Sequence, residues 1–186
     1  AFRIQNSEKC RNRSFLITPD GYVSAYYDKV HMFDVRLSQN EIYEESAFYE
    51  RGSKSTFMDV EFGRIGMTIY YDVRFPNLYT HLALNGANII TVPSAFTKNT
   101  GEKHWEVLLR SRAIETGAFI VAPAQTGKHG NLNRISHGNS MVVSPSGEVL
   151  LNLGTDPGVG LVEIDLSQTD EYRQKIPNLR NIVNFS

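Results

Sequence analysis

The sequence predicts a single layered α/β domain in which helices cover β-sheets. Helical segments at residues 76–85 and 103–117 alternate with short apolar strands, and the strands outnumber the helices, which is typical of this class. The 186 residues, of which 41% are hydrophobic, can form one core of ordinary size. Since no repeat or linker divides the chain, we expect residues 1–186 to be one domain.

The N-terminal part predicts a hairpin followed by a long loop. Strands are expected at residues 14–17 and 22–27 around Pro19-Asp20-Gly21, because proline presets a turn dihedral and glycine accepts a positive φ. Residues 29–51 show no hydrophobic period and carry scattered charge. They are therefore expected to form a surface loop with at most a short helix.

A second hairpin is expected from residues 56–62 and 65–71, with a turn at Gly63. Its second strand is mostly apolar, so burial on both faces is expected. Pro76 suits the first turn of the helix that follows, and Gly86 suits its end.

The C-terminal part predicts a helix, several strands and a final helix. Residues 103–116 repeat apolar side chains at three- and four-residue spacing, and Gly117 ends the pattern. Ser167 is expected to cap a last helix that ends before Pro177. The intervening segments are predicted as strands at 88–92, 118–123, 139–144, 148–153 and 159–165, with a polar loop at 129–136.

Composition argues against several functional classes. Nineteen Lys and Arg residues stand against 20 Asp and Glu, which gives no general attraction to nucleic acid or anionic lipid. Neither a membrane span nor a signal peptide is recognisable, and Cys10 is the only cysteine, so we expect no disulfide and a cytoplasmic protein. The five histidines form no metal-binding motif, and no phosphate-binding loop or G-x-S-x-G motif occurs.

Several segments together resemble the nitrilase superfamily of carbon-nitrogen hydrolases, and most closely its Nit amidase branch. Their order along the chain matches the family throughout. They are Tyr26-Tyr27-Asp28-Lys29-Val30-His31-Met32-Phe33-Asp34, Gly66 through Pro76, Pro93-Ser94-Ala95-Phe96, Thr100 through Glu106, Ala122-Pro123-Ala124-Gln125 and Gly138-Asn139-Ser140.

The resemblance implies an αββα sandwich, in which two mixed sheets are covered by helices. It also implies hydrolysis of a small carboxylate amide to acid and ammonia, without a metal or organic cofactor, by a homodimer that uses the helix at 103–117 as a subunit contact. The family's catalytic groups are Glu, Lys and Cys, with a second supporting Glu. The first Glu is expected upstream of Ala1, so we expect an N-terminally incomplete domain that exposes apolar surface.

Carried onto this sequence, the family's motifs imply a catalytic set of Lys29, Glu45 and Tyr70. Lys29 would stabilise the oxyanion, Glu45 would support the reacting groups, and Tyr70 occupies the position of the cysteine nucleophile. A phenol has an ordinary pKa near 10, against about 8.5 for a thiol, and its ring is larger. The implied substrate-binding residues are Tyr71, Arg74, Pro93, Ser94, Ala95, Phe96 and His104.

Simpler interpretations stay open for these residues. Lys29 could be a surface cation, and Glu45 could belong to a solvated acidic face with Glu41 and Glu44. Asp72 and Arg74 could form a structural ion pair. In the helix at 103–117, His104 and Trp105 could simply pack, and Arg112 could pair with Glu115.

Two hypotheses for the function follow. The chain is either an amidase of the Nit type or a pseudoenzyme that retains the fold for binding or dimer formation after loss of the thiol. Tyr70 acting as a nucleophile and Cys10 replacing the missing thiol are two lesser alternatives. An error in the sequence at codon 70 is another.

Overall fold

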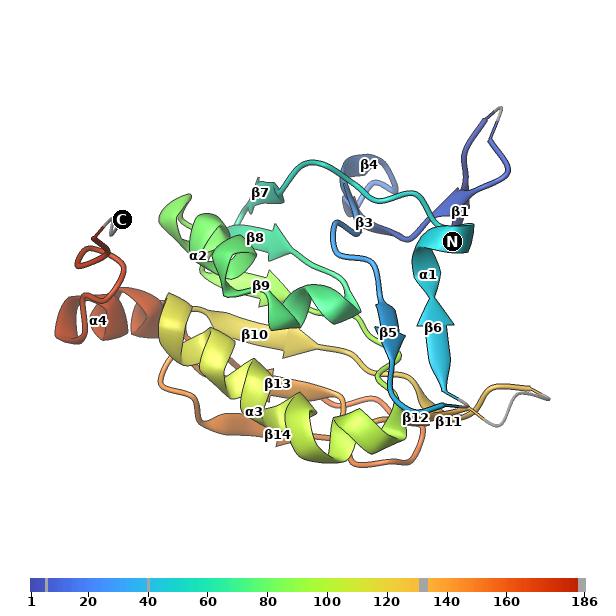
Figure 1. Ribbon diagram of the computed structural model, residues 1–186. Coiled ribbons are helices and arrows are strands. Elements are labelled where there is room, and N and C mark those ends of the chain that lie inside the picture. Colours follow the sequence, from blue (N-terminus) through green and yellow to red (C-terminus); the bar gives the residue numbers. More distant parts are fainter. Residues whose placement is uncertain (6, 40, 131–133, 184–186) are drawn as a thin grey trace.

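The computed structural model describes residues 1–5, 7–39, 41–130 and 134–183, and it confirms the α/β class (Figure 1). A six-stranded mixed sheet, in the order β14-β13-β10-β9-β8-β7, forms its centre. The neighbours β8, β9 and β10 are parallel, whereas the other pairs in this sheet are antiparallel. Its strands are β7 (Thr56–Val60), β8 (Gly63–Met67), β9 (Ile89–Thr91), β10 (Phe119–Ala122), β13 (Met141–Val143) and β14 (Val149–Asn152).

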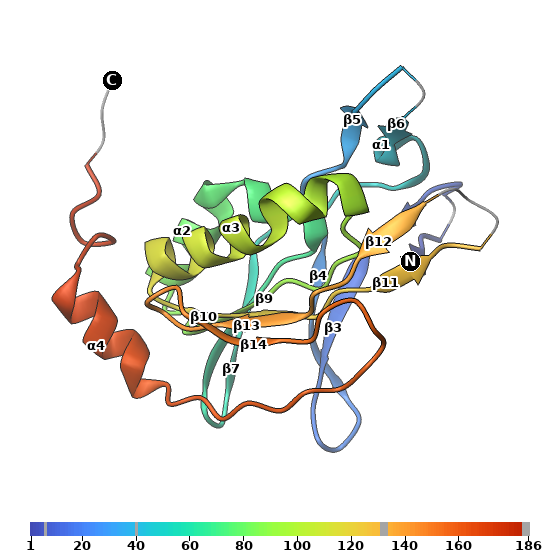
Figure 2. The ribbon, with the colours of Figure 1, turned by 90° about the horizontal axis from the view of Figure 1, so that it is seen from below.

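Two helices, α2 (Pro76–Leu84) and α3 (Lys98–Thr116), lie on one side of this sheet (Figure 2). Their fully buried side chains, among them Leu82 and Trp105, join the hydrophobic core. Gly66 of β8 allows the close approach of α2, because a Cβ there would lie 3.2 Å from the Leu82 side chain. Helix α2 begins at proline as predicted.

Four two-stranded sheets accompany the large sheet in the described residues. The predicted first hairpin is confirmed, and Thr56 at the start of β7 donates a hydrogen bond to the Tyr26 carbonyl in β4. The loops expected at 29–51 and 129–136 contain strands, so those two predictions were wrong in part. The pairs are β1 (Phe2–Arg3) with β2 (Cys10–Arg11), β3 (Arg13–Ile17) with β4 (Val23–Asp28), β5 (Asp34–Arg36) with β6 (Ile42–Glu44), and β11 (Thr126–Lys128) with β12 (Ile135–His137).

Two predicted boundaries also differ from the structure. The strand expected to run to Tyr71 ends at Met67 and turns into a 3-10 helix, η1 (Tyr70–Arg74). The Asp72 carboxylate accepts the Ile69 N–H at 2.8 Å, which draws the chain into a turn. Helix α3 begins at Lys98 rather than at 103. Gly101 in its first turn allows the close approach of His137, since a Cβ there would lie 2.4 Å from the His137 side chain.

The strand predicted at residues 159–165 is absent from the structure. No described strand pairs with this segment. Its Val159 and Leu161 side chains are 92% and 94% exposed. Helix α4 (Ser167–Lys175) follows, and its cap also differs from the prediction. Ser167 lies inside the helix, and its N–H donates to the Asp165 carboxylate at 2.9 Å.

No helix in the described residues is long and apolar enough to cross a bilayer.

The packing of α2 against the sheet predicts a difference between two leucines of the same helix. Leu82 is fully buried and Leu84 is 59% exposed. We expect Leu82→Ala to lower the free energy of unfolding by about 2–5 kcal/mol, because it removes buried methyl groups and leaves a cavity. The control Leu84→Ala should change it by no more than about 0.5 kcal/mol. Urea denaturation checks both, and equal effects would contradict the packing.

Candidate active site

A cleft of about 1100 Å³ lies where the three parallel strands end. Its wall includes Ile69 and Tyr70 after β8, Pro93 to Ala95 after β9, and Pro123 to Gln125 after β10. The carboxyl ends of these strands point toward the β5, β6 and α1 (Glu45–Phe48) segment, which supplies a further part of the wall (Figure 1). Ligands commonly bind at the carboxyl ends of parallel strands, so this cleft is the candidate active site.

Lys29 and Glu45 form an ion pair, in which Glu45 lines the cleft and Lys29 does not. Lys29 follows β4 directly, its side chain has no exposed surface, and its ammonium donates a hydrogen bond to Glu45 Oε2. The same oxygen accepts the Phe33 N–H at 2.6 Å. Burial lowers the pKa of Lys29 more than the Glu45 carboxylate raises it. Lys29 is therefore a buried cation that depends on one acidic partner, not a surface cation.

Tyr70 extends into the cleft from a strained turn. Its φ of 50° lies in the left-handed region, which is uncommon for a bulky residue, and its N–H donates to the Pro93 carbonyl at 3.1 Å. The phenol ring is 8% exposed and lies 5.1 Å from the Lys29 ammonium, measured to the ring centroid. Phe33 and Phe96 contact the ring edge to face, at centroid distances of 5.2 and 5.3 Å.

The environment of Tyr70 keeps its phenol protonated. Burial raises its pKa above the ordinary value near 10, and this effect exceeds the lowering by the Arg134 and Arg74 guanidinium groups. The ring occupies the space next to the Lys29 ammonium. A neutral, buried phenol is a poor nucleophile.

Asp72, which is fully buried, holds the turn in place. Its Oδ2 accepts the Tyr27 hydroxyl and the Ile69 N–H, each at 2.8 Å. Its Oδ1 accepts His31 Nδ1–H at 2.7 Å and the His31 backbone N–H at 3.2 Å. No ion pair joins Asp72 to Arg74 within the described residues, so the structural pair considered from the sequence is replaced by this network.

The structure brings together only part of the proposed substrate-binding set. Pro93, Ser94 and Ala95 line the cleft with Tyr70 and Glu45. The other four, which are Tyr71, Arg74, Phe96 and His104, lie outside its lining residues.

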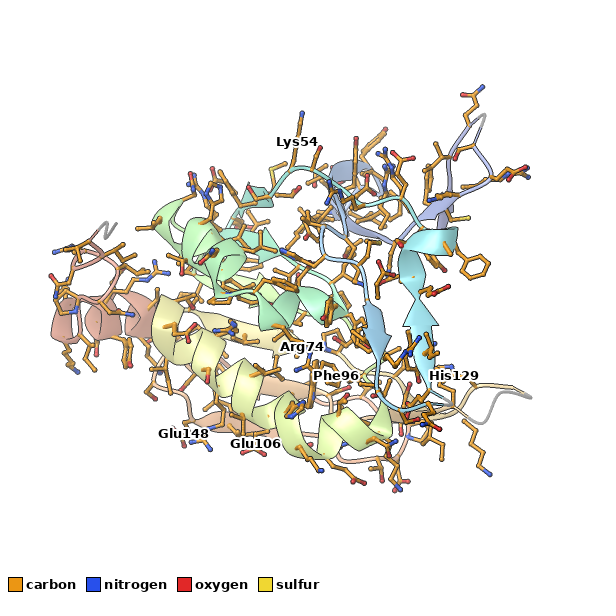
Figure 3. The ribbon with its side chains drawn as sticks, in the orientation of Figure 1. Lys54, Arg74, Phe96, Glu106, His129 and Glu148 are labelled. Carbon is orange, nitrogen blue, oxygen red and sulfur yellow. The ribbon has the colours of Figure 1, made fainter. Side chains whose placement is uncertain are left out.

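Arg74 and Phe96 lie beside the first half of α3 (Figure 3), with the Arg74 guanidinium 5.2 Å from the centroid of the Phe96 ring. The Nη2 atom of Arg74 also lies 3.3 Å from His104 Nδ1. Trp105 is fully buried and its ring N–H donates to the Asn139 carbonyl, so its role is packing. The expected pair of Arg112 with Glu115 is present.

Several other residues of the cleft wall were not proposed from the sequence. Phe33 and Tyr43 contribute rings, Ser140 and Gln125 contribute polar groups, and Arg134 contributes a guanidinium. Phe33, Gln125 and Ser140 had appeared only as parts of family motifs. Arg134 lies in a segment taken for a polar loop, where no periodic pattern marks a side chain as inward-facing.

No group of three or more His, Cys, Asp or Glu side chains that could hold a metal ion occurs in the part of the chain that the structure describes.

Comparisons with known proteins identify the family. Residues 2–174 match the carbon-nitrogen hydrolase family. The chain belongs to the carbon-nitrogen hydrolase family.

Relatives within this family include enzymes named for amide hydrolysis. The chain is 42% identical over 177 residues to a deaminated glutathione amidase of Synechocystis, which covers 94% of the chain and 65% of the relative. It is 41% identical over 174 residues to the human deaminated glutathione amidase, covering 93% of the chain and 53% of the relative. The chain thus spans less than two thirds of the length of these carbon-nitrogen hydrolases.

Solved structures of the family share the fold. The Caenorhabditis elegans NitFhit protein superposes with a TM-score of 0.88 at 40% identity, over 94% of this chain and 42% of that protein. Nit3 of Saccharomyces cerevisiae, a member of branch 10 of the nitrilase superfamily, gives 0.80 at 31% identity, over 91% of this chain and 58% of Nit3. The predicted resemblance is confirmed, and the chain belongs to the Nit type within the carbon-nitrogen hydrolase family.

The buried ion pair predicts that Glu45→Gln destabilises the fold. The substitution leaves the Lys29 ammonium buried without its carboxylate, which should lower the free energy of unfolding at pH 7 by about 3 kcal/mol. Because it removes a group that raises the Lys29 pKa, that pKa should fall further. At pH values between the Lys29 pKa of the folded variant and the Lys29 pKa of the unfolded chain, the unfolded chain binds more protons. The free energy of unfolding of the variant should therefore rise with pH up to about 10.

Urea denaturation at pH 7 and pH 9 measures this effect. The exposed neighbour Glu44, changed to Gln, is the matched control and should alter stability by no more than about 0.5 kcal/mol. Equal stability of Glu45→Gln and Glu44→Gln would show that the Lys29 ammonium does not depend on Glu45.

Proposed function

We propose that this chain carries the cleft of an amidase that hydrolyses a small carboxylate amide, and that Tyr70 disables the cleft by replacing the nucleophile. The observation that supports this proposal is the placement of Tyr70. It extends from a left-handed turn at the end of β8, and its ring lies 5.1 Å from an ammonium group that Glu45 holds in place.

The chemistry explains why this position matters. In the reaction that the family resemblance implies, a cysteine thiolate adds to the amide carbon and the Lys ammonium stabilises the resulting oxyanion. The carbon-nitrogen bond then breaks, and ammonia leaves with a proton supplied by glutamate. Water releases the acid from the enzyme in a second step. Tyr70 offers no thiolate, and burial keeps its phenol protonated.

The alternative is a pseudoenzyme, which binds a ligand or a second subunit but performs no hydrolysis. The observation in its favour is the close packing of the Tyr70 ring between Phe33 and Phe96, which fills the space beside Lys29 with an inert group. The relatives named for deaminated glutathione support the view that any ligand is a small amide with carboxylate groups.

We also propose that the protein is a cytoplasmic homodimer that uses α3. Two apolar side chains on this helix, Val107 and Ile114, are 63% and 41% exposed. They are seven residues apart, so they lie on the same face of the helix. An exposed apolar stripe of this kind suits a subunit contact.

Replacing Tyr70 by cysteine tests the catalytic proposal. The protein is expressed from its complete gene, so that any residues that precede Ala1 are included, and ammonia release from succinamate is measured. We expect the unmodified protein to be inactive and Tyr70→Cys to exceed Tyr70→Ala by at least about a thousandfold, because Tyr70→Ala opens the same space without supplying a nucleophile.

The other outcomes are equally informative. If the unmodified protein releases ammonia, Tyr70 does not disable it, and Tyr70→Phe then tests whether the phenol acts. If folded Tyr70→Cys is inactive on small amides, the amidase proposal is rejected and the pseudoenzyme alternative is favoured.

Val107→Glu tests the proposed dimer. A carboxylate in the centre of an apolar contact is costly to bury, so this variant should sediment as a monomer at concentrations where the unmodified protein is a dimer. Phe62→Glu on the β7–β8 turn, where Phe62 is 64% exposed, is the control and should leave the dimer unchanged. A dimer unaffected by Val107→Glu would place the contact elsewhere.

A further inference from the structure

Arg134 contributes a guanidinium group to the wall of the Tyr70 cleft. It precedes β12, it is half-buried, and it lines the cleft together with Tyr43 and Tyr70. Its guanidinium carbon lies 5.0 Å from the centroid of the Tyr43 ring, which supports the group from one side. The β11–β12 hairpin therefore presents this cation toward the β6 side of the cleft.

Among the described residues, no carboxylate forms an ion pair with Arg134, and no hydrogen bond from its guanidinium is found. The other charged groups of the wall differ in this respect. Arg13 donates two hydrogen bonds to Asp28, and Glu45 accepts from Lys29. Glu44 is exposed to solvent, where water screens its charge.

The charge balance of the cleft therefore favours an anion. The Lys29 and Glu45 charges offset each other, and Arg134 remains as a half-buried cation whose five donors have no acidic partner in the protein. A guanidinium has a planar fork of donors that matches the two oxygens of a carboxylate. Buried cations are normally paired, so a bound anion would complete this site.

We propose that Arg134 binds a carboxylate of the ligand and thereby selects acidic ligands over neutral ones of the same shape. This inference deepens the proposed function and rests on it for the nature of the reaction, but not for the binding itself. Arg134 is then a specificity-determining residue beside Tyr43 of β6, while Tyr70 and Lys29 mark the reacting end. The ligand must carry an acidic group apart from its amide.

Binding of small probes tests the inference without requiring turnover. Succinate, succinamate and the neutral succinamide have similar shapes and differ in charge, and their binding to the unmodified protein is measured by titration calorimetry. We expect succinate and succinamate to bind and Arg134→Gln to weaken both by roughly ten- to a hundredfold, the usual range for a charge-assisted hydrogen bond. Arg134→Lys should restore part of this loss, because it keeps the charge but not the fork.

Two controls separate recognition from general effects. Lys128→Gln removes one positive charge from the exposed surface of the same hairpin, and it should leave all three affinities unchanged. Succinamide should bind Arg134→Gln as well as it binds the unmodified protein. The thermal midpoint of each variant shows whether Arg134 has a structural role instead.

The results distinguish this inference from the proposed function. Loss of acidic-probe binding in Arg134→Gln supports the carboxylate site even if Tyr70→Cys releases no ammonia. The inference is overturned if succinate does not bind the unmodified protein, if Arg134→Gln binds succinate equally well, or if succinamide binding falls to the same extent. Turnover by Tyr70→Cys with unchanged preference in Arg134→Gln would retain the amidase and reject this site.

Discussion

The ion pair between Lys29 and Glu45 organises the region around the cleft. An ammonium group without exposed surface needs an acidic partner, and that partner comes from the start of α1, sixteen residues further along the chain. Glu45 also accepts the Phe33 N–H, so the same carboxylate fixes two points of the intervening segment. The β5–β6 hairpin is thereby held against the end of β4, and it becomes a wall of the cleft rather than a loose surface loop.

A second constraint, the Asp72 network, acts from the opposite side. One buried carboxylate joins Tyr27 at the end of β4, His31 in the following segment, and the backbone at Ile69. The end of β8 and the chain after β4 are therefore held together independently of what occupies position 70. The Lys29 ion pair and this network place Tyr70 and the Lys29 ammonium next to each other, and the identity of that one side chain then determines which chemistry is possible.

Much of the fold could be predicted from local patterns. The first two hairpins, α2 and the apolar strands of the large sheet were expected because turn residues and apolar periodicity act over a few neighbouring residues. The turn at 70–74 was missed because the apolar run continues through Tyr71, whereas the carboxylate that ends the strand comes from Asp72. The strand expected at 159–165 has the right alternation of side chains but no neighbouring strand among the described residues.

The site was less accessible to sequence reasoning. Lys29 and Glu45 were proposed only through the family resemblance, since nothing in a lysine beside tyrosines or in an acidic cluster shows which charges will be buried together. No sequence pattern marked Arg134 as a residue of the site, because Arg134 reaches the cleft only when the β11–β12 hairpin folds beside β6. Contacts between segments some ninety residues apart, such as that of Arg134 with Tyr43, are set by the tertiary fold.

The left-handed turn at position 70 has a consequence for how such a protein can change over time. Since the turn is held by hydrogen bonds to Asp72 and to the Pro93 carbonyl, and not by the phenol, its backbone conformation does not require a tyrosine at that position. Codons for tyrosine and cysteine differ by a single base. A lineage with this architecture could therefore lose or regain a nucleophile in one mutational step, without rebuilding the surroundings that make a nucleophile useful.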